Sequence, residues 1–364
     1  MNRAMPSNAQ TATNDSYCEI PSVRLQRRRD TSRPYRLLRL TAEHGMIHPD
    51  PTDYYNRLQK ERIDCPICSG KKQQLLFCGD RYGMGVETVG CKRCGMIFIN
   101  PRPTEKAMLN FYQTEYRRLY EAVEVPTEEY VSAGPFRPRA HYVVNAIDSI
   151  LENGKGMRFL DIGCGEGTLL QTVKNNHPQV ECFGLEPDPN FAAYARSNSG
   201  AEDVFCSDFG SFFDGNQQTF HVIALTHVLE HLLDPVATLT RIREILEPGG
   251  FFYVEVPNIA DPRTSGLGQI HLGHVMSFAP GTLTRALQTA GFEVTKFFSG
   301  DLPAKTPAMA ALCRPGSMQK RFSFGIRRPA VRRSEINKGF RDFQSAVCGL
   351  PAAKESGWLR RLAG

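Results

Sequence analysis

The periodicity of hydrophobic and polar positions along the chain changes at residue 157. From there, short β-rich runs alternate with amphipathic segments, an order that favours strands separated by helices. The strand-like runs are MRFLDI, ECFGLE, DVFCSDF, FHVIALT and FFYVEVPN, and the amphipathic segments include EGTLLQTVKNN, PNFAAYARSN and VATLTRIREIL. The alternation predicts an α/β fold on a doubly wound, mostly parallel sheet, which reaches seven strands when the two runs described next are counted.

The last two predicted strands, EVTKFF and PAMAALCR, follow the helical segment GTLTRALQTAG. A short connection that holds Gly300, Asp301 and Pro303 joins them, which leaves little room for a helical crossover. The pair is therefore expected to form an antiparallel hairpin that closes the sheet.

Residues 103–155 have helical periodicity. In KAMLNFYQTEYRRLYEA, hydrophobic side chains recur near helical spacing at Met108, Phe111, Tyr112, Tyr116 and Tyr120. A second amphipathic run, HYVVNAIDSILENG, ends on the Asn-Gly dipeptide that is typical of a helix C-cap. This part of the chain is predicted to be a helical linker.

Charge is distributed unevenly along the 364 residues. Residues 1–50 hold 8 basic and 5 acidic side chains, residues 51–313 hold 24 and 30, and residues 314–364 hold 12 and 3. The leader, residues 1–60, has little periodicity and is expected to be a flexible solvated segment. A basic arm for an acidic partner, or a short helix over residues 35–40, is the alternative.

Membrane insertion and secretion are not expected. The chain has no run of about 18 apolar residues, and its N-terminus has no apolar signal region. Without secretion, the 11 cysteines favour free thiols and metal ligands over disulfides, and therefore a reducing, cytoplasmic location.

Four cysteines form two matched pairs, Cys65-x2-Cys68 and Cys91-x2-Cys94, separated by 22 residues. Each pair is followed by a glycine within two residues, so each can form a knuckle that directs two thiolates at one point. The spacing predicts a structural zinc ribbon over residues 61–102, with a hairpin between the pairs and no open coordination position. Cys78 lies outside the pattern, and nothing around the pairs favours a redox role.

A glycine-rich turn follows the first predicted strand of the sheet. The sequence LDIGCGEGTLL runs from an apolar strand into a helix, and its spacing is neither the dinucleotide pattern nor a P-loop. Glycines at 163 and 165 let the backbone approach a ligand closely. A nucleotide-like ligand without a phosphate fits best.

Acidic residues end the next two predicted strands. Glu186 lies about 20 residues past the glycines, where a carboxylate can accept hydrogen bonds from both ribose hydroxyls. Asp208 ends the third strand and can reach an exocyclic amine, while the Phe209 ring can flank a purine. Taken singly, such an aspartate is most often a cap or turn residue.

Residues 157–314 resemble a class I S-adenosylmethionine-dependent methyltransferase. The resemblance is carried by LDIGCGEGTLL, GLEPDP, CSDF, FHVIALTHVLEHLLDP and LEPGGFFYVEVPN, in that order. It implies a methyltransferase domain at 156–314 and S-adenosylmethionine as cofactor. The implied cofactor-binding residues are Asp161, Gly163, Cys164, Gly165, Gly167, Glu186, Asp208, Phe209 and His227. Cys164 is read as a small packing residue within the loop, because no base is positioned to activate it.

The block from CPICSG to FYQTEYRRLY is similar to the zinc-binding N-terminal region of bacterial methyltransferases of sugar and polysaccharide biosynthesis. This second resemblance implies that the aromatic-rich helix within residues 103–155 lies over the cofactor cleft as a lid. A helix merely packed on the sheet is the alternative.

Methyl transfer needs two positioned reactants and, for some acceptors, a base. The candidates are His231 and Glu230 in THVLEHLLDP, expected to begin the helix after the fourth strand, and His274 in HLGHVMSFAP. Sugar C-methyltransferases carry a Tyr-x-Glu-His tetrad at the latter site, whereas this chain has His271-Leu-Gly273-His274. That departure favours O-methylation of a sugar-type or other hydroxyl acceptor, nucleotide- or lipid-linked, with His274 as the base.

Two other functions remain open at this point. An RNA methyltransferase could hold nucleic acid with the ribbon and the basic ends, although Lys71-Lys72 and Lys92-Arg93 are the only basic clusters of the ribbon. A non-catalytic cofactor-binding protein is disfavoured by the intact glycine loop. The basic C-terminal tail, residues 315–364, is predicted to pack one helix on its own domain, with peripheral contact to an anionic membrane as the alternative. No oligomeric state is predicted.

Overall fold

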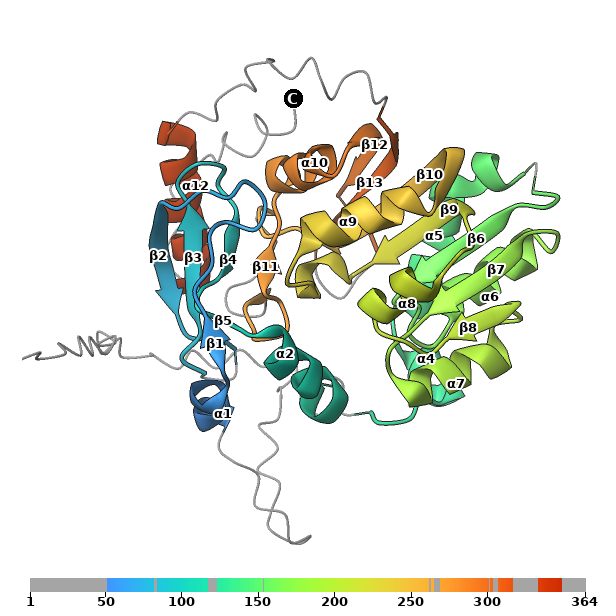
Figure 1. Ribbon diagram of the computed structural model, residues 1–364, viewed down its shortest axis with the longest axis horizontal. Coiled ribbons are helices and arrows are strands. Elements are labelled where there is room, and N and C mark those ends of the chain that lie inside the picture. Colours follow the sequence, from blue (N-terminus) through green and yellow to red (C-terminus); the bar gives the residue numbers. More distant parts are fainter. Residues whose placement is uncertain are drawn as a thin grey trace, which may run out of the picture. The chain divides into compact units, whose positions relative to one another are not determined.

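The computed structural model describes residues 51–316 and 333–348, apart from 82–83, 117–122, 153, 262, 265–268, 301 and 304–306. All of them belong to the unit Pro49–Gly364 (Figure 1). The expectations for residues 1–50, for Tyr120 and for the tail beyond 348 lie outside the described residues.

A seven-stranded sheet forms the centre of the methyltransferase-like region. Its order is β12-β13-β10-β9-β6-β7-β8 (Figure 1). The strands are β6 Arg158–Ile162, β7 Glu181–Leu185, β8 Asp203–Phe205, β9 Phe220–Thr226, β10 Leu246–Pro257, β12 Phe292–Ser299 and β13 Ala308–Pro315. The neighbouring strands β8, β7, β6, β9 and β10 pair in parallel. Strand β13 pairs antiparallel with both β10 and β12. The mostly parallel sheet and its closing hairpin are as the sequence predicts.

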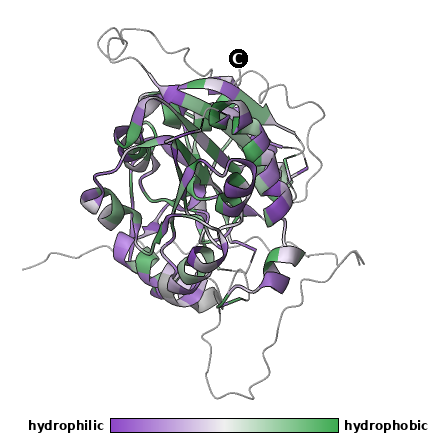
Figure 2. Cartoon of the chain, turned by 90° about the vertical axis from the view of Figure 1, so that its right-hand side faces the viewer, coloured by the Kyte–Doolittle hydropathy of each residue, from purple (hydrophilic) through white to green (hydrophobic). Residues whose placement is uncertain are grey.

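Both faces of this sheet are covered, which explains its nearly continuous apolar strands. Along β9, Val222 and Ala224 belong to one buried cluster and Ile223 and Leu225 to the other, because side chains alternate across a strand. The first cluster includes residues of α5 Phe136–Leu151, α6 Thr168–Asn176 and α7 Pro189–Asn198. The second includes residues of α8 Phe209–Gly215, α9 Pro235–Glu244 and α10 Pro280–Thr289. Figure 2 shows hydrophobic residues concentrated on the inner strands.

Capping residues set where several helices begin. The Asp188 carboxylate accepts from the backbone N–H groups of Asn190 and Phe191, with a proline at the first position of α7. Asp234 caps α9 in the same way, again with a proline next. The expectation that Glu230 and His231 begin this helix is wrong, because they lie in a separate 3-10 turn, Leu229–His231.

The cysteine pairs lie in turns that precede β2 and follow β3 of a second, four-stranded antiparallel sheet of order β11-β4-β3-β2, with Cys91 as the last residue of β3. Its strands are β2 Gln73–Cys78, β3 Glu87–Cys91, β4 Ile97–Ile99 and β11 Met276–Ser277. The first two form the hairpin expected between the cysteine pairs. The outer strand β11 comes from the far side of the sequence, and Met276 pairs with Phe98. Beside this sheet, β1 Lys60–Glu61 pairs with β5 Arg102–Pro103, and α1 Pro51–Arg57 comes before β1.

The linker is helical but is not one continuous helix. It contains α2 Glu105–Phe111, a π-helical turn at Tyr112–Tyr116 and α4 Glu128–Ala133. The π turn interrupts the α-helical periodicity predicted through this segment, and it places Tyr112 and Tyr116 against His231.

The described part of the tail, α12 Arg333–Cys348, packs on the cysteine-bearing sheet. The buried residues of this contact are Leu76, Ile97, Ile270, Ile336, Phe340, Phe343 and Val347. A Cβ on Gly90 would lie 2.4 Å from the Phe340 ring, so the close approach needs a glycine there. The sequence predicts a tail helix packed on its own domain; the structure has the helix and packs it on the cysteine-bearing sheet, whereas membrane contact stays a prediction. Within the described residues, no helix has the length and apolar character needed to cross a membrane.

Candidate functional site

The glycine loop between β6 and α6 has a backbone that only glycines adopt easily. Gly163, Gly165 and Gly167 have φ of 73°, 56° and 84°. A Cβ on Gly163 would lie 2.4 Å from Cγ2 of Val228, and one on Gly167 would lie 2.9 Å from Cβ of Ala195. These two glycines are therefore needed for packing. Gly165 has open space at its Cβ position, so it is the one where a ligand could approach the backbone.

Three carboxylates lie around this loop. Glu186, at the end of β7, accepts from the Gly165 N–H at 3.0 Å and from the Asp188 N–H at 3.1 Å. Asp161 is buried in β6, and its Oδ1 accepts no hydrogen bond from the described residues. Burial, together with the charges of Glu166 and Glu186, raises the pKa of Asp161 to about 8. A cationic ligand would stabilise the ionised form of Asp161 and lower its pKa, and S-adenosylmethionine carries cationic groups.

The other predicted cofactor residues take more ordinary positions. Asp208 is exposed and caps α8, accepting from the Ser211 N–H at 2.9 Å and its hydroxyl at 2.7 Å. Phe209 is half-buried against the core. Cys164 is buried, and burial raises the pKa of its thiol well above the usual value, which fits a packing role. The contacts of Asp208 and Phe209 with adenine stay predictions.

His227 lies directly after β9 in a left-handed conformation, with φ of 55°. Such a backbone is uncommon outside glycine and concentrates at functional sites. The Nε2 atom donates to Oε1 of Glu255 at 2.9 Å, and Nδ1 lies 3.6 Å from Oε1 of Glu230. Burial and Arg139 oppose protonation, but the two glutamates outweigh them and raise the pKa of His227.

Glu255 is a functional candidate that the sequence analysis missed. It is fully buried on β10, where it also accepts from the Tyr253 hydroxyl at 3.0 Å and lies 3.6 Å from Nε of Arg139. Burial raises its pKa, but His227 and Arg139 outweigh burial and leave the pKa below the usual value. The available signal was one acidic residue in the apolar run FFYVEVPN.

The three predicted catalytic residues come together. Oε1 of Glu230 lies 3.9 Å from Nε2 of His231 and 4.0 Å from Nε2 of His274. The His271 ring packs against the His274 ring, with centroids 3.8 Å apart and planes tilted by 40°. Burial and the charge of His231 lower the pKa of His274 to about 3, so it is neutral but a weak proton acceptor.

Backbone carbonyls orient two of these imidazoles. A carbonyl oxygen can only accept, so Nδ1 of His231 donates to Gly273 at 2.8 Å and Nδ1 of His274 donates to Gln269 at 3.2 Å. The Tyr112 hydroxyl lies 3.0 Å from Nδ1 of His231 and donates to the Gly273 oxygen at 3.2 Å. The predicted lid region therefore contacts the predicted catalytic residues, a contact the sequence did not specify.

Gly273 is the position at which the sequence resemblance places the tetrad glutamate. A Cβ there would lie 3.1 Å from both Nδ1 of His271 and Cε2 of Tyr116. The site is therefore tightly packed at this position, and its backbone oxygen serves the cluster instead of a side chain.

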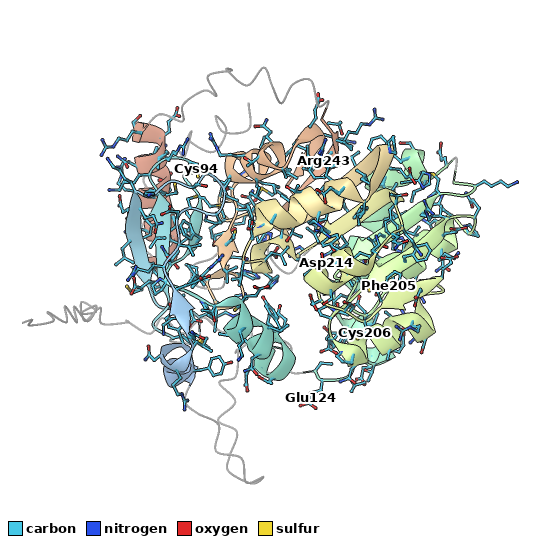
Figure 3. All side chains as sticks on the ribbon, in the orientation of Figure 1. Cys94, Glu124, Phe205, Cys206, Asp214 and Arg243 are labelled. Carbon is cyan, nitrogen blue, oxygen red and sulfur yellow. The ribbon has the colours of Figure 1, made fainter. Side chains whose placement is uncertain are left out.

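The four predicted metal ligands also meet. The Sγ atoms of Cys65 and Cys94 lie 3.5 Å apart, and those of Cys68 and Cys91 lie 3.6 Å apart. All four sulfurs lie within 4.8 Å of one another. Four Zn–S bonds of about 2.3 Å in a tetrahedron separate the sulfurs by a little under 4 Å, so the cluster could hold zinc. Cys94 is labelled in Figure 3.

Comparison with known proteins finds similarity in the central segment. Residues 137–296 match a family model described as a methyltransferase domain. The ubiquinone biosynthesis O-methyltransferase of Cereibacter sphaeroides is 29% identical over 129 residues, which cover 35% of this chain and 51% of that protein. An uncharacterized methyltransferase of Schizosaccharomyces pombe is 32% identical over 104 residues, covering 26% and 37%.

The CcbJ methyltransferase from Streptomyces caelestis, a solved structure, is 16% identical with a TM-score of 0.40, covering 50% of this chain and 90% of that one. The chain spans about half the length of the first curated relatives it matches. The domain match and the O-methyltransferase relatives support an S-adenosylmethionine-dependent methyltransferase.

Proposed function

We propose that this chain transfers a methyl group from S-adenosylmethionine to a hydroxyl group of a small molecule. The observation that carries the proposal is the buried carboxylate of Asp161 beside the glycine loop, with Glu186 at the tip of the next strand. Asp161 would be favoured in its ionised form by a ligand that brings positive charge, and the Glu186 carboxylate suits a ribose.

Different residues of the chain are proposed to bind different parts of the cofactor. Asp161 would face its cationic amino end, and binding would favour ionisation of this carboxylate. Gly165 offers an approachable backbone, and Glu186 would exchange its loop hydrogen bonds for the two ribose hydroxyls. Asp208 and Phe209 are proposed to flank the adenine. The cofactor supplies an electrophilic methyl group on sulfur.

The acceptor is proposed to lie against the cluster of Glu230, His231 and His274. These side chains would orient the acceptor hydroxyl and accept its hydrogen bond. The relatives named as O-methyltransferases support oxygen as the methylated atom, and the packed glycine at position 273 supports it against carbon. A sugar-type acceptor is the finer proposal and rests on the resemblance of the N-terminal region.

The cysteine cluster is proposed to hold a structural zinc ion through Cys65, Cys68, Cys91 and Cys94. Four thiolates complete a tetrahedral shell and leave no position for a reacting water. Its role would be to hold the small sheet together, and through β11 to hold the segment that precedes α10.

Calorimetry with S-adenosylmethionine tests the cofactor site directly. Glu186→Gln should weaken binding by about 10-fold or more, since hydrogen bonds to a charged group are worth about 1.5–3 kcal/mol. Glu181→Gln is the matched control, because Glu181 begins the same strand and is exposed. Absence of binding by the unmodified chain would overturn the proposal.

The acceptor class can be found with isotope-labelled cofactor. Nucleotide sugars, lipid-linked sugars, polyphenols and RNA would be offered separately, with label transfer followed by mass spectrometry. Label on a small-molecule oxygen supports the proposal. Label on RNA, with affinity that falls steeply as salt rises, would favour the nucleic-acid alternative.

A further inference from the structure

The cluster at Glu230 has an unusual balance of donors and acceptors. Both oxygens of this carboxylate are buried, and neither accepts a hydrogen bond within the described residues. The side chain is only 2% exposed. A buried carboxylate normally acquires several donors, so its surroundings need a separate explanation.

The explanation lies in the ring orientation of the two histidines. Because the Nδ1 atoms of His231 and His274 both donate to backbone carbonyls, their Nε2 atoms carry lone pairs when the rings are neutral. Those Nε2 atoms are the ones that lie 3.9 and 4.0 Å from Oε1 of Glu230. Oε1 of Glu230 and the two Nε2 atoms thus converge as three electron-pair donors, and Nδ1 of His227 lies 3.6 Å from the same glutamate oxygen.

Such an arrangement is how proteins prepare ligands for a cation. A metal-bound histidine almost always donates its other ring N–H to a backbone carbonyl or carboxylate, which fixes its orientation. In a tetrahedron, bonds of about 2.0–2.2 Å would hold the three ligand atoms about 3.3–3.6 Å apart. The distances from Oε1 of Glu230 to the two Nε2 atoms, 3.9 and 4.0 Å, need to shorten by only about 0.4 Å to reach that range.

The set of ligands also defines the kind of site. Two imidazoles and one carboxylate leave coordination positions open, as in catalytic zinc sites and in facial triads. A small cavity lies beside Glu230 and His274, and Gln269 and Ser277 also line it. The cysteine cluster, by contrast, is closed by four thiolates.

We propose that Glu230, His231 and His274 form a second metal site, which binds a divalent transition-metal cation such as Zn²⁺. Tyr112, through its contacts with His231 and the Gly273 oxygen, positions the second ligand. Bound at an open position, an acceptor hydroxyl would lose its proton more easily, because a cation stabilises the oxyanion. This catalytic use rests on the proposed function, whereas cation binding does not.

Cobalt titration of the full chain tests binding without any turnover. Co²⁺ bound to thiolates has a strong charge-transfer absorption, whereas Co²⁺ bound to nitrogen and oxygen has only weaker visible bands. With zinc retained in the cysteine cluster, we expect one further equivalent of Co²⁺ to bind without the thiolate absorption. Only thiolate-type binding, or no second equivalent, would overturn the proposal.

Two ligand variants and one control make the assignment specific. Glu230→Gln and His274→Ala should each weaken the second equivalent by at least about 100-fold, more than the 10–100-fold cost of disturbing an outer partner. His177→Ala is the control, because that buried histidine pairs with Asp148 in another part of the fold. Retained zinc at the cysteine cluster and an unchanged circular dichroism spectrum show that the variants fold.

A second equivalent that survives both ligand variants would place the ion elsewhere and overturn the assignment. Loss of methyl transfer with intact cation binding would instead contradict the proposed function alone. The two outcomes are therefore distinguishable.

Discussion

Met276 pairs in antiparallel register with Phe98, so the segment that carries His274 supplies the outer strand of the cysteine-bearing sheet. The Ile99 N–H donates to the Val275 oxygen at 3.0 Å and extends this connection. His274 is thereby held by a sheet whose other three strands come from the N-terminal side of the chain. Destabilising that sheet should therefore displace His274 and disturb the candidate site.

Cys94→Ser tests this connection. Removing one of four ligands should release the metal and lower the free energy of unfolding by about 4 kcal/mol or more, as loss of a structural metal does. Methyl transfer should fall further than affinity for S-adenosylmethionine, because the glycine loop lies on the other sheet. Metal analysis, denaturant unfolding and calorimetry check the three parts.

Cys206→Ser is the control for the cysteine variant, since Cys206 is exposed and follows β8 at the far edge of the large sheet (Figure 3). It should leave metal content and stability unchanged. Equal behaviour of the two variants would contradict the structural role of the cluster.

Asp161→Asn should change how stability depends on pH. The folded pKa of about 8 lies above the ordinary value of 3.8, so the folded chain binds a proton that the unfolded chain has lost. The contribution of Asp161 is therefore fully present below pH 3.8 and is lost as pH rises toward 8. Asparagine removes this loss, so the variant should gain stability relative to the parent across that window.

Denaturant unfolding of the cofactor-free chain at several pH values measures this difference. The stability gain of Asp161→Asn should be largest near pH 8 and absent near pH 4. The same substitution should weaken S-adenosylmethionine binding, so stability and affinity move in opposite directions. A gain that does not vary with pH would contradict the buried-carboxylate explanation.

Gly163→Ala should lower the free energy of unfolding by more than the strain of a left-handed backbone alone. Gly156 also has positive φ, at 77°, but has nothing within 4 Å of its Cβ position. Gly156→Ala should therefore cost only the left-handed penalty of about 1–2 kcal/mol. At Gly163 the new methyl group meets Val228, the residue after His227, so both stability and cofactor affinity should fall further. Equal costs would mean that Val228 moves away freely.

Phe340→Ala should destabilise the chain by about 3–5 kcal/mol, because it empties a fully buried position between α12 and the small sheet. Affinity for S-adenosylmethionine should not change. Arg341→Ala, on the exposed side of the same helix, is the control and should have little effect. Denaturant unfolding and calorimetry provide the two measurements, and a shared loss of affinity would contradict the separation.

The features predicted correctly from sequence are those with local signals. The glycine loop at residues 163–167 follows an apolar strand directly, and the paired cysteines lie within four residues of each other. The closing hairpin was evident because its connection is too short for a crossover. Each of these features forms between residues that are close in the sequence, so the spacing of the residues determines the local geometry.

The features that were missed depend on contacts between distant residues. Nothing around Met276 indicates a two-residue strand, because its partner Phe98 lies in another part of the sequence. The contact between Tyr112 and His231 joins residues 119 positions apart. The sequence predicts a helix start at Glu230, but the structure has a 3-10 turn there, and the helix capped by Asp234 begins five residues later.

The contact between α12 and β2 also bears on how the chain is made. The Gln344 side chain donates to the Leu76 oxygen across 268 residues of sequence. The hairpin between the cysteine pairs can form early in synthesis, but its apolar face stays uncovered until the whole large sheet has been translated. Contacts of such long range form slowly and expose surface that aggregates. A newly made chain is therefore expected to be most prone to aggregation in the interval before α12 leaves the ribosome.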